Sequence, residues 1–341
     1  MKDAELRLPT YYLHQIADEL AKESVDTNQW LARVGLTINK IDQMGQMISF
    51  SQFKTLISDA IHLSAKPALG LRVGQRLGLT THGMLGYAIS ASSCLRETVE
   101  LFSRYLNTRT PLLRVELVST EDILTIELHE CYLLAKIEIP VFESAIFTLH
   151  NLLMQVTNHK APIERIEFPY HQPAYVDLYH QLFAQPVQFD RPFASLSLFQ
   201  SELDRPLPMA DQNSLKQAKL ICEQELIRLQ SKEELKSRIR KYLLSTQNNF
   251  PCLKEVAEYF HMSQRTLHRR LKEDKSGYSE ILKNVREYRA TEMLSKKDKT
   301  IQEIGFSLGY SDIANFRKAF KRWRGCSPRD FRRKSVRADS F

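Results

Sequence analysis

Cysteine is sparse in this chain of 341 residues, and long apolar runs are missing. The five cysteines are an odd number, and none belongs to a Cys-x-x-Cys pair, which favours free thiols in a reducing compartment. No stretch of about 18 apolar residues occurs, and residues 1–9 lack the apolar core of a signal peptide. These absences predict a cytoplasmic protein with no membrane partner, no metal site and no cofactor.

Signatures of common enzyme classes are also missing. His129-Glu130 lacks the second histidine of a His-Glu-x-x-His site, and neither Gly-x-Ser-x-Gly nor a nucleotide-binding glycine pattern occurs. His62 and His150 stand within apolar helical patterns, which are typical of core or edge residues. The sequence therefore predicts that the protein is not an enzyme. An RNA-binding or architectural protein is a rival class, but the aromatic residues stand at core spacings and form no stacking platform.

Charge is divided unevenly along the chain. Residues 231–341 carry 27 Lys and Arg against 14 Asp and Glu, a net charge of +13. Residues 1–230 carry 21 against 26, a net charge of −5. The length suits two domains, and a basic domain joined to a mildly acidic one indicates that the carboxyl-terminal part binds a polyanion.

The first two hundred residues mix helical and strand patterns. Two alternating segments separated by the polar residues 119–122 predict a β-hairpin. Gly70, Gly74 and Gly78 recur at four-residue spacing, which could let two backbones approach closely or could mark local packing or a turn. The pattern predicts helices at 10–33, 50–63, 95–106, 140–157 and 174–184, and strands at 113–117, 124–128, 163–168 and 187–189.

A proline-containing segment at 205–208 interrupts this pattern, and a helix is expected over 211–229. Leu215, Cys222 and Leu229 recur at seven-residue spacing, with Ala218 at an intermediate apolar position. Two heptads are too few to define a coiled coil. The segment is either a linker helix packed on its own domain or a contact between two copies of the chain.

The carboxyl-terminal part contains an internal repeat. Val256 recurs 48 positions later as Ile304, and Leu267 recurs 49 positions later as Phe316, which places one extra residue near Ser311. Each copy has a helical apolar stripe, a short break, and a second helix with apolar positions four apart. This arrangement predicts two helix-turn-helix motifs, joined by a helix over 278–295 that packs on both.

The second helix of each motif is the expected DNA reader. Ser263 and Asp312 are suitable amino-terminal caps, and Trp323 continues the second core stripe, where we expect it to be buried. Arginine can pair with guanine and asparagine with adenine, although a basic helix face can also be merely solvated. The outward side chains are Gln264, Arg265, His268, Arg269 and Lys272 in the first motif, and Ala314, Asn315, Arg317, Lys318, Arg322 and Arg324 in the second.

These segments closely resemble the AraC/XylS family of transcription regulators. The resemblance is carried by Ser-Gln-Arg-Thr-Leu-His-Arg-Arg-Leu at 263–271, Ile-Gly-Phe-Ser-Leu-Gly-Tyr-Ser at 304–311, Phe-Arg-Lys-Ala-Phe-Lys-Arg-Trp at 316–323 and Gly-Cys-Ser-Pro at 325–328. The family usually has alanine where Gly305 stands, which costs about 1 kcal/mol of helix propensity. In the first part, His-Gly-Met-Leu-Gly-Tyr at 82–87 and Leu-Asp-Arg-Pro-Leu-Pro at 203–208 resemble an arabinose-binding-type sensor domain.

The resemblance implies an α+β sensor domain followed by an all-α domain with two helix-turn-helix motifs. It implies contact with double-stranded promoter DNA and RNA polymerase, and usually activation of transcription. The base-contact positions would be Arg265, His268, Arg269, Ala314, Asn315 and Lys318, and the expected phosphate ligands are Gln264, Lys272, Arg317, Arg322, Arg324, Arg332 and Arg333. The expected boundaries are a sensor at 1–205, a linker with a helix at 206–232, a DNA-binding domain at 233–334 and a basic tail at 335–341.

The role of the first domain is open at this point. It could sense a small-molecule effector, or it could form a homodimer without a ligand, and the protein could then activate or repress. Arg72, Arg76, Arg104 and Arg109 could meet an acidic ligand or could be ordinary surface charge. Ligand-binding residues cannot be assigned from the sequence.

Overall fold

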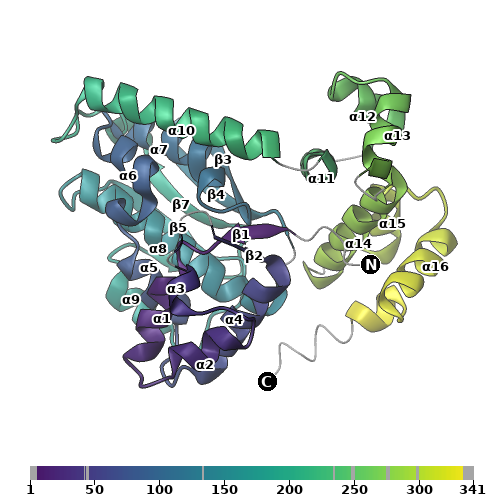
Figure 1. The fold of residues 1–341 in the computed structure, drawn as a ribbon, viewed down its shortest axis with the longest axis horizontal. Helices are drawn as coiled ribbons and strands as arrows, with labels where there is room; N and C mark the ends of the chain where they lie inside the picture. Colours follow the sequence, from purple (N-terminus) through teal and green to yellow (C-terminus); the bar gives the residue numbers. More distant parts are fainter. Residues whose placement is uncertain are drawn as a thin grey trace. The chain divides into compact units, whose positions relative to one another are not determined.

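A computed structural model describes residues 6–41, 43, 46–132, 134–232, 235–246, 250–273, 277–296 and 299–332. The chain divides into two compact units, Met1–Ser231 and Lys232–Phe341, which are described separately (Figure 1). Arg333 and the expected basic tail lie outside the described residues.

A five-stranded sheet forms the centre of the first unit. Its order is β3-β4-β7-β5-β6, and every pairing is antiparallel except the parallel pair β5–β6. The expected hairpin is confirmed as β3 and β4, and the two further expected strands are β5 and β6. The bounds are β3 (Leu113–Ser119), β4 (Ile123–Glu130), β5 (Ile163–Glu167), β6 (Val187–Gln188) and β7 (Ala194–Phe199), with a separate antiparallel pair β1 (Arg7–Pro9) and β2 (Met47–Ser49).

The middle strand, β7, was absent from the strands expected from sequence. It reads Ala-Ser-Leu-Ser-Leu-Phe, and all of its residues except Phe199 are buried. The small serines face a covered side of the sheet, where Ser197 and Thr125 of β4 share a hydrogen bond of 3.0 Å. Because serine is common in loops, the alternation alone did not distinguish a buried strand from a connecting segment.

Helices cover the sheet and complete the first unit. The single helix expected over 10–33 is wrong, because the chain breaks after α1. Ser24 adopts a left-handed conformation with φ of 60°, and the side chain of Asp26 then accepts hydrogen bonds from two amides of the next helix. The helices are α1 (Leu13–Ala21), α2 (Thr27–Ala32), α3 (Ile38–Ile41), α4 (Phe50–Leu63), α5 (Leu69–Arg76), α6 (Gly83–Ser90), α7 (Leu95–Tyr105), α8 (Glu138–Val156), α9 (Val176–Leu182) and α10 (Gln212–Lys232).

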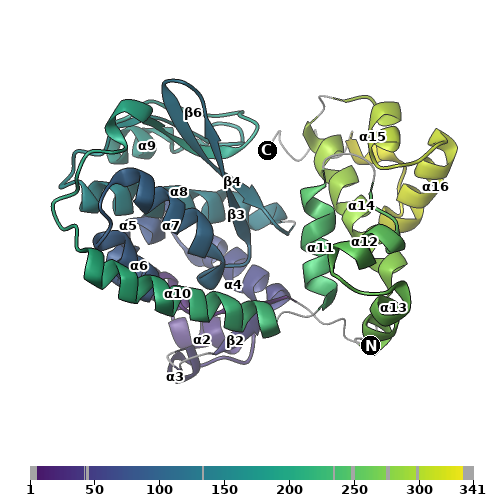
Figure 2. The same ribbon diagram turned by 90° about the horizontal axis from the view of Figure 1, so that it is seen from above.

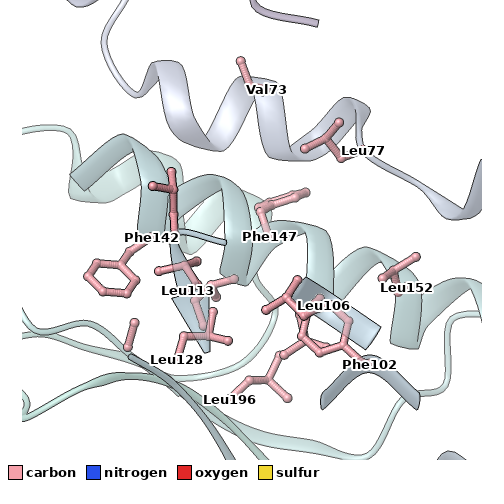
Figure 3. Packing of buried hydrophobic residues seen from close by; sticks show 14 of the residues in the cluster. Val73, Leu77, Phe102, Leu106, Leu113, Leu128, Phe142, Phe147, Leu152 and Leu196 are labelled. Carbon is pink, nitrogen blue, oxygen red and sulfur yellow. The ribbon is translucent and has the colours of Figure 1, made fainter. Parts of the chain in front are cut away.

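Helices α5 and α8 pack with unusually close backbones. A β-carbon added at Gly70 would lie 2.4 Å from the carbonyl oxygen of Pro140, and one at Gly74 would lie 2.8 Å from Cβ of Phe147. At Gly78 it would meet only the side chain of Gln155. The glycine spacing therefore marks a close approach for its first two members. Figure 3 shows the apolar side chains of both helices in one core with residues of the sheet.

Helix α8 is the principal core helix of this unit. By length and composition, the segment Ala135–Val156 is the one described helix that could cross a membrane. However, 61% of its most apolar window is buried within the unit, against α5 and the sheet. This burial matches the core helix of a globular domain.

Helix α10 packs on its own unit through the heptad positions noted in the sequence. Leu215, Ala218 and Cys222 are at most 2% exposed. Figure 2 shows α10 running beside α6 and α7, and polar contacts join these helices. The contacts are Tyr87–Ser214 at 3.1 Å, Glu97–Lys219 at 2.7 Å and Arg104–Glu223 at 3.0 Å. The sequence allowed either packing on the helix's own domain or a contact between two copies of the chain. For the face of α10 that carries Leu215, Ala218 and Cys222, packing on its own domain is correct.

The second unit is built from helices alone within its described residues. Its two apolar clusters are centred on separate helix pairs, α12–α13 and α15–α16. The connecting helix α14 supplies Ile281 and Val285 to the first cluster, and Ala290 and Leu294 to the second. The bounds are α11 (Leu235–Ser245), α12 (Leu253–Tyr259), α13 (Gln264–Glu273), α14 (Tyr278–Lys296), α15 (Ile301–Ser307) and α16 (Ile313–Arg324).

One carboxyl group is buried in the α5–α8 contact. Glu143 is 1% exposed and accepts hydrogen bonds from the hydroxyls of Tyr175 and Tyr179, at 2.9 and 2.6 Å. Backbone amides of Gly70 and Leu71 also donate to it. Burial raises the pKa of Glu143 to about 7, against the opposing effect of these four donors.

This burial predicts a pH-dependent stability. Between the unfolded pKa of 4.5 and the folded pKa of about 7, the folded state holds the extra proton. Stability therefore falls as pH rises through this window, by about 3 kcal/mol in total. In urea unfolding of the full chain between pH 4.5 and 8, Glu143→Gln should remove this decrease. Glu121→Gln, in the exposed β3–β4 turn, should retain it, and an unchanged slope in Glu143→Gln would contradict the assignment.

Candidate nucleic-acid interface

The two turns of the second unit have the same backbone hydrogen bonds, 48 residues apart. The amide of Met262 donates to the carbonyl of Ala257 at 2.8 Å, and the amide of Tyr310 donates to that of Gly305 at 3.1 Å. The preceding residues, His261 and Gly309, both adopt left-handed conformations, with φ of 53° and 77°. The repeat read from the sequence is therefore a repeat of backbone geometry.

Both expected caps are confirmed. Ser263 Oγ accepts from the amide of Thr266 at 3.1 Å, and Asp312 Oδ1 accepts from the amide of Ala314 at 2.9 Å. The caps are 49 positions apart, so the extra residue lies in the second turn. Each cap binds an amide of the first turn, three residues on in α13 and two residues on in α16, and the chain continues as a helix.

The predicted base-contact side chains are all exposed. In α13, Leu267 and Leu271 are at most 1% exposed and turn inward, whereas the polar positions face outward. In α16, Phe316 and Phe320 are fully buried. The exposed set is Arg265, His268, Arg269, Ala314, Asn315 and Lys318, together with Gln264, Lys272, Arg317 and Arg322 of the predicted phosphate ligands.

Three of the predicted DNA ligands already have partners within the unit. Arg269 lies 3.2 Å from Glu273 one helical turn away, and both side chains are more than half exposed, so this pair is weak. Arg324 lies 2.9 Å from Glu287 of α14, with both side chains largely covered. Arg332 donates to the carbonyl of Lys299 at 2.7 Å. Arg324 and Arg332 therefore already bind groups of their own unit. This makes them weaker candidates for phosphate contact than the exposed cations.

A basic groove of about 400 Å³ lies between α14 and α16. It is lined by four cations, two aromatic residues and a few small or polar ones, and contains no carboxylate. None of the four cations forms an ion pair with any described residue. The lining residues are Ser279, Lys283, Arg286, Tyr310, Asn315, Lys318, Ala319, Arg322 and Trp323.

Arg286 forms the inner wall of this basic groove. Its guanidinium lies 5.2 Å from the ring of Tyr310 and 5.5 Å from that of Phe250, and its Nε is buried without a hydrogen-bond acceptor. Burial raises the pKa of Tyr310, while the charges of Arg286 and Arg322 lower it. A cation held by aromatic rings and not by a carboxylate keeps its full charge for an anionic ligand.

Lys283 and Arg286 were not singled out from the sequence, and the structure adds them as candidate interface residues. Both lie on the connecting helix, where isolated cations are indistinguishable from ordinary solvated charge. Trp323 was expected to be buried, and this is wrong, because it is only partly buried at the edge of the groove. Only the folded chain brings Lys283 of α14 and Lys318 of α16 to the same groove. The sequence alone does not show that these two residues are neighbours.

Among the described residues, no three His, Cys, Asp or Glu side chains gather as a metal site. The candidate interface consists instead of two exposed, capped helices and a basic groove. This is the arrangement of a protein that binds duplex DNA through a pair of helix-turn-helix motifs.

Comparison with known proteins agrees with this class. The family model described as the arabinose-binding domain of AraC transcription regulators matches residues 25–207, and a helix-turn-helix domain model matches residues 256–334. The chain belongs to the AraC family of transcription regulators, and it is a DNA-binding transcription regulator.

Several relatives share most of its length. The ornithine utilization regulator of Pseudomonas aeruginosa is 30% identical over 96% of this chain and 97% of its own. An uncharacterized regulator of Mycobacterium tuberculosis, Rv1395, is 25% identical over 97% and 98%. The activator RhaS of Klebsiella pneumoniae is 39% identical over 24% of this chain and 30% of its own. The crystal structure of CdpR from Pseudomonas aeruginosa covers 95% of this chain and 98% of its own, with 18% identity and a TM-score of 0.48.

The basic groove predicts a contribution of charge to DNA affinity that does not depend on base sequence. Lys283→Ala should weaken binding to every duplex by a similar factor and reduce the slope of log K against log salt by about one. Asn284→Ala, at the exposed uncharged neighbour on the same helix, should leave the slope unchanged. Fluorescence anisotropy at several salt concentrations measures both, and an equal slope for wild type and Lys283→Ala would exclude the groove from the interface.

Proposed function

We propose that this protein activates transcription by reading two successive major-groove segments of a promoter, one with α13 and one with α16. The observation that carries this proposal is the pair of equivalent, capped and exposed helices on the shared helix α14. A rigid connector would hold the two helices at a fixed separation on one face of the duplex.

Different side chains of the two helices would contact different bases and phosphates. Arg265 and Arg269 can each donate two hydrogen bonds to guanine, and Asn315 can pair with adenine. Ala314 leaves room for a thymine methyl group. Gln264, Lys272, Arg317 and Arg322 would set the register by binding phosphates, which adds salt-dependent affinity without base preference.

The proposed spacing can be tested by changing the DNA. Two recognition helices on one domain should contact segments about 34 Å apart, which is one helical turn. Inserting five base pairs between the segments turns them to opposite faces of the duplex, so affinity should fall to that of a single segment. Inserting ten base pairs is the control, because it returns the two segments to the same face of the duplex but leaves them one helical turn farther apart. Undiminished binding after the five-base-pair insertion would leave one motif as the sole reader.

The role as an activator is supported by relatives. RhaS, which matches 83 residues of this chain, is named as an activator, and the full-length relative is named for ornithine utilization. By analogy, this protein would control genes for the use of a small nutrient, with the first unit sensing a small molecule and the second contacting promoter DNA and RNA polymerase. Repression would instead be indicated if the bound protein lowered transcription from its promoter.

Homodimer formation is proposed through the outer face of α10. Leu220 and Ile227 are 59% and 57% exposed, on the side of the helix away from the buried heptad positions, and Ile221 is 45% exposed on its flank. Large apolar side chains grouped on a solvent-facing helix are typical of a subunit contact. A second copy offering the same face would cover them symmetrically.

The dimer proposal predicts a change of mass. The double variant Leu220→Lys and Ile227→Lys should convert a dimer to a monomer, because two lysines would face two others across the symmetric contact. Leu63→Lys, at another exposed apolar position on α4, should keep the wild-type mass. Light scattering at micromolar concentration distinguishes the outcomes, and a dimer that persists in the double variant would place the contact elsewhere.

A further inference from the structure

Three of the four arginines noted in the first unit are held by carboxylates. Arg72 pairs with Glu23 at 2.5 Å, Arg76 pairs with Asp18 at 2.5 Å, and Arg104 pairs with Glu223. Arg109 forms no ion pair with any residue that the structure describes. An arginine that is partly buried and has no counterion requires a separate explanation.

Arg109 is positioned by neutral groups. Its Nη2 donates to the carbonyl of Thr81 at 3.0 Å, and its guanidinium lies 4.2 Å from the ring of Tyr11 and 5.9 Å from that of Tyr12. Its Nε is buried and has no acceptor. Gly83 stands beside it with φ of 56°, and a β-carbon there would lie 3.6 Å from Nη1. The guanidinium is thus fixed in place with part of its donor capacity unused.

His82 lies next to the same tyrosine and also has an unused nitrogen. It is 4% exposed, its Nδ1 lies 3.1 Å from the hydroxyl of Tyr12, and its Nε2 is buried without a partner. Arg109 also donates toward the Tyr12 hydroxyl, so that hydroxyl can give its own proton to Nδ1. Nε2 then carries the imidazole proton. Burial, with a smaller effect from Arg109, lowers the pKa of His82 to about 4, so the ring is neutral near pH 7.

Arg109 and His82 both contact Tyr12, and each has one buried nitrogen, Nε and Nε2, with no hydrogen-bond partner among the described residues. Leaving buried donors unpaired is costly, so the folded protein should supply an acceptor. Both are N–H groups and one belongs to a full positive charge, which selects an anion with more than one acceptor oxygen. We propose that Arg109, His82 and Tyr12 form a binding site for the carboxylate group of a small-molecule effector.

The place of this site in the fold connects it to the linker helix. The charge of Arg109 acts on the thiol of Cys222, which α10 buries against the first unit. Helix α6 begins at Gly83 beside the site, and its Tyr87 bonds to Ser214 of α10. Helix α10 ends at Lys232, where the second unit begins. A carboxylate at the site would neutralise Arg109 and reposition groups against which α10 packs, which gives the effector a route to the DNA-binding unit.

The inference rests on the proposal that the first unit senses a small molecule, and acetate is the probe because it is a minimal carboxylate. The melting temperature of the full chain is measured in increasing sodium acetate, with sodium chloride keeping the ionic strength constant. Wild type should show a saturable rise of about 2–4 °C. Arg109→Gln should lose the rise, whereas Arg96→Gln, whose guanidinium is paired with Asp204 at 2.8 Å, should keep it.

A second measurement needs no variant. In ¹⁵N NMR spectra of the wild-type chain, the Nε2 signal of His82 should shift with acetate over the same concentration range. If bound water satisfies the two donors instead, acetate will give no saturable rise in melting temperature and no shift of the His82 signal, and the proposal is overturned. An equal rise in Arg109→Gln and wild type would also overturn it. Binding to duplex DNA is measured in parallel, so that loss of the DNA-binding function is not mistaken for loss of this site.

Discussion

The proposed DNA-reading surface depends on the packing of helix α14 into two separate cores. Ile281 and Val285 belong to the core of the first motif, and Ala290 and Leu294 belong to that of the second. Neither motif could bury its apolar stripe without this helix. Because the core positions of α14 are fixed by side-chain packing, the separation of α13 and α16 is a property of one helix and not of a flexible linker. The same helix also presents Lys283 and Arg286 to the basic groove.

The second unit was largely predictable because its sequence repeats both spacing and chemistry. The caps at Ser263 and Asp312, the extra residue in the second turn and the joining helix all follow from local patterns that tertiary packing did not change. Gly305 departs from the family's alanine, and the structure supplies a reason. A β-carbon there would lie 3.1 Å from Ile313 and 3.3 Å from Phe316, so these larger side chains occupy the space.

The errors arose where a local pattern had more than one tertiary outcome. The apolar spacing over 10–33 continues through a break that a left-handed Ser24 produces, and periodicity does not register such a break. Strand β7 is covered on both faces, so its serines resembled a loop. The close approach at Gly70 and the basic groove both need a partner element far away in sequence. The unpaired donors of Arg109 and His82 are likewise invisible in sequence, because an unpaired donor is defined by its surroundings.

The two turns of the second unit differ in one respect that affects its stability. The left-handed position is filled by Gly309 in the second motif but by His261 in the first. A side chain in that conformation costs about 1–2 kcal/mol relative to glycine. The first motif therefore carries a conformational cost at its turn that the second motif avoids. Because α14 joins both cores, removing that cost with His261→Gly would stabilise the two motifs together.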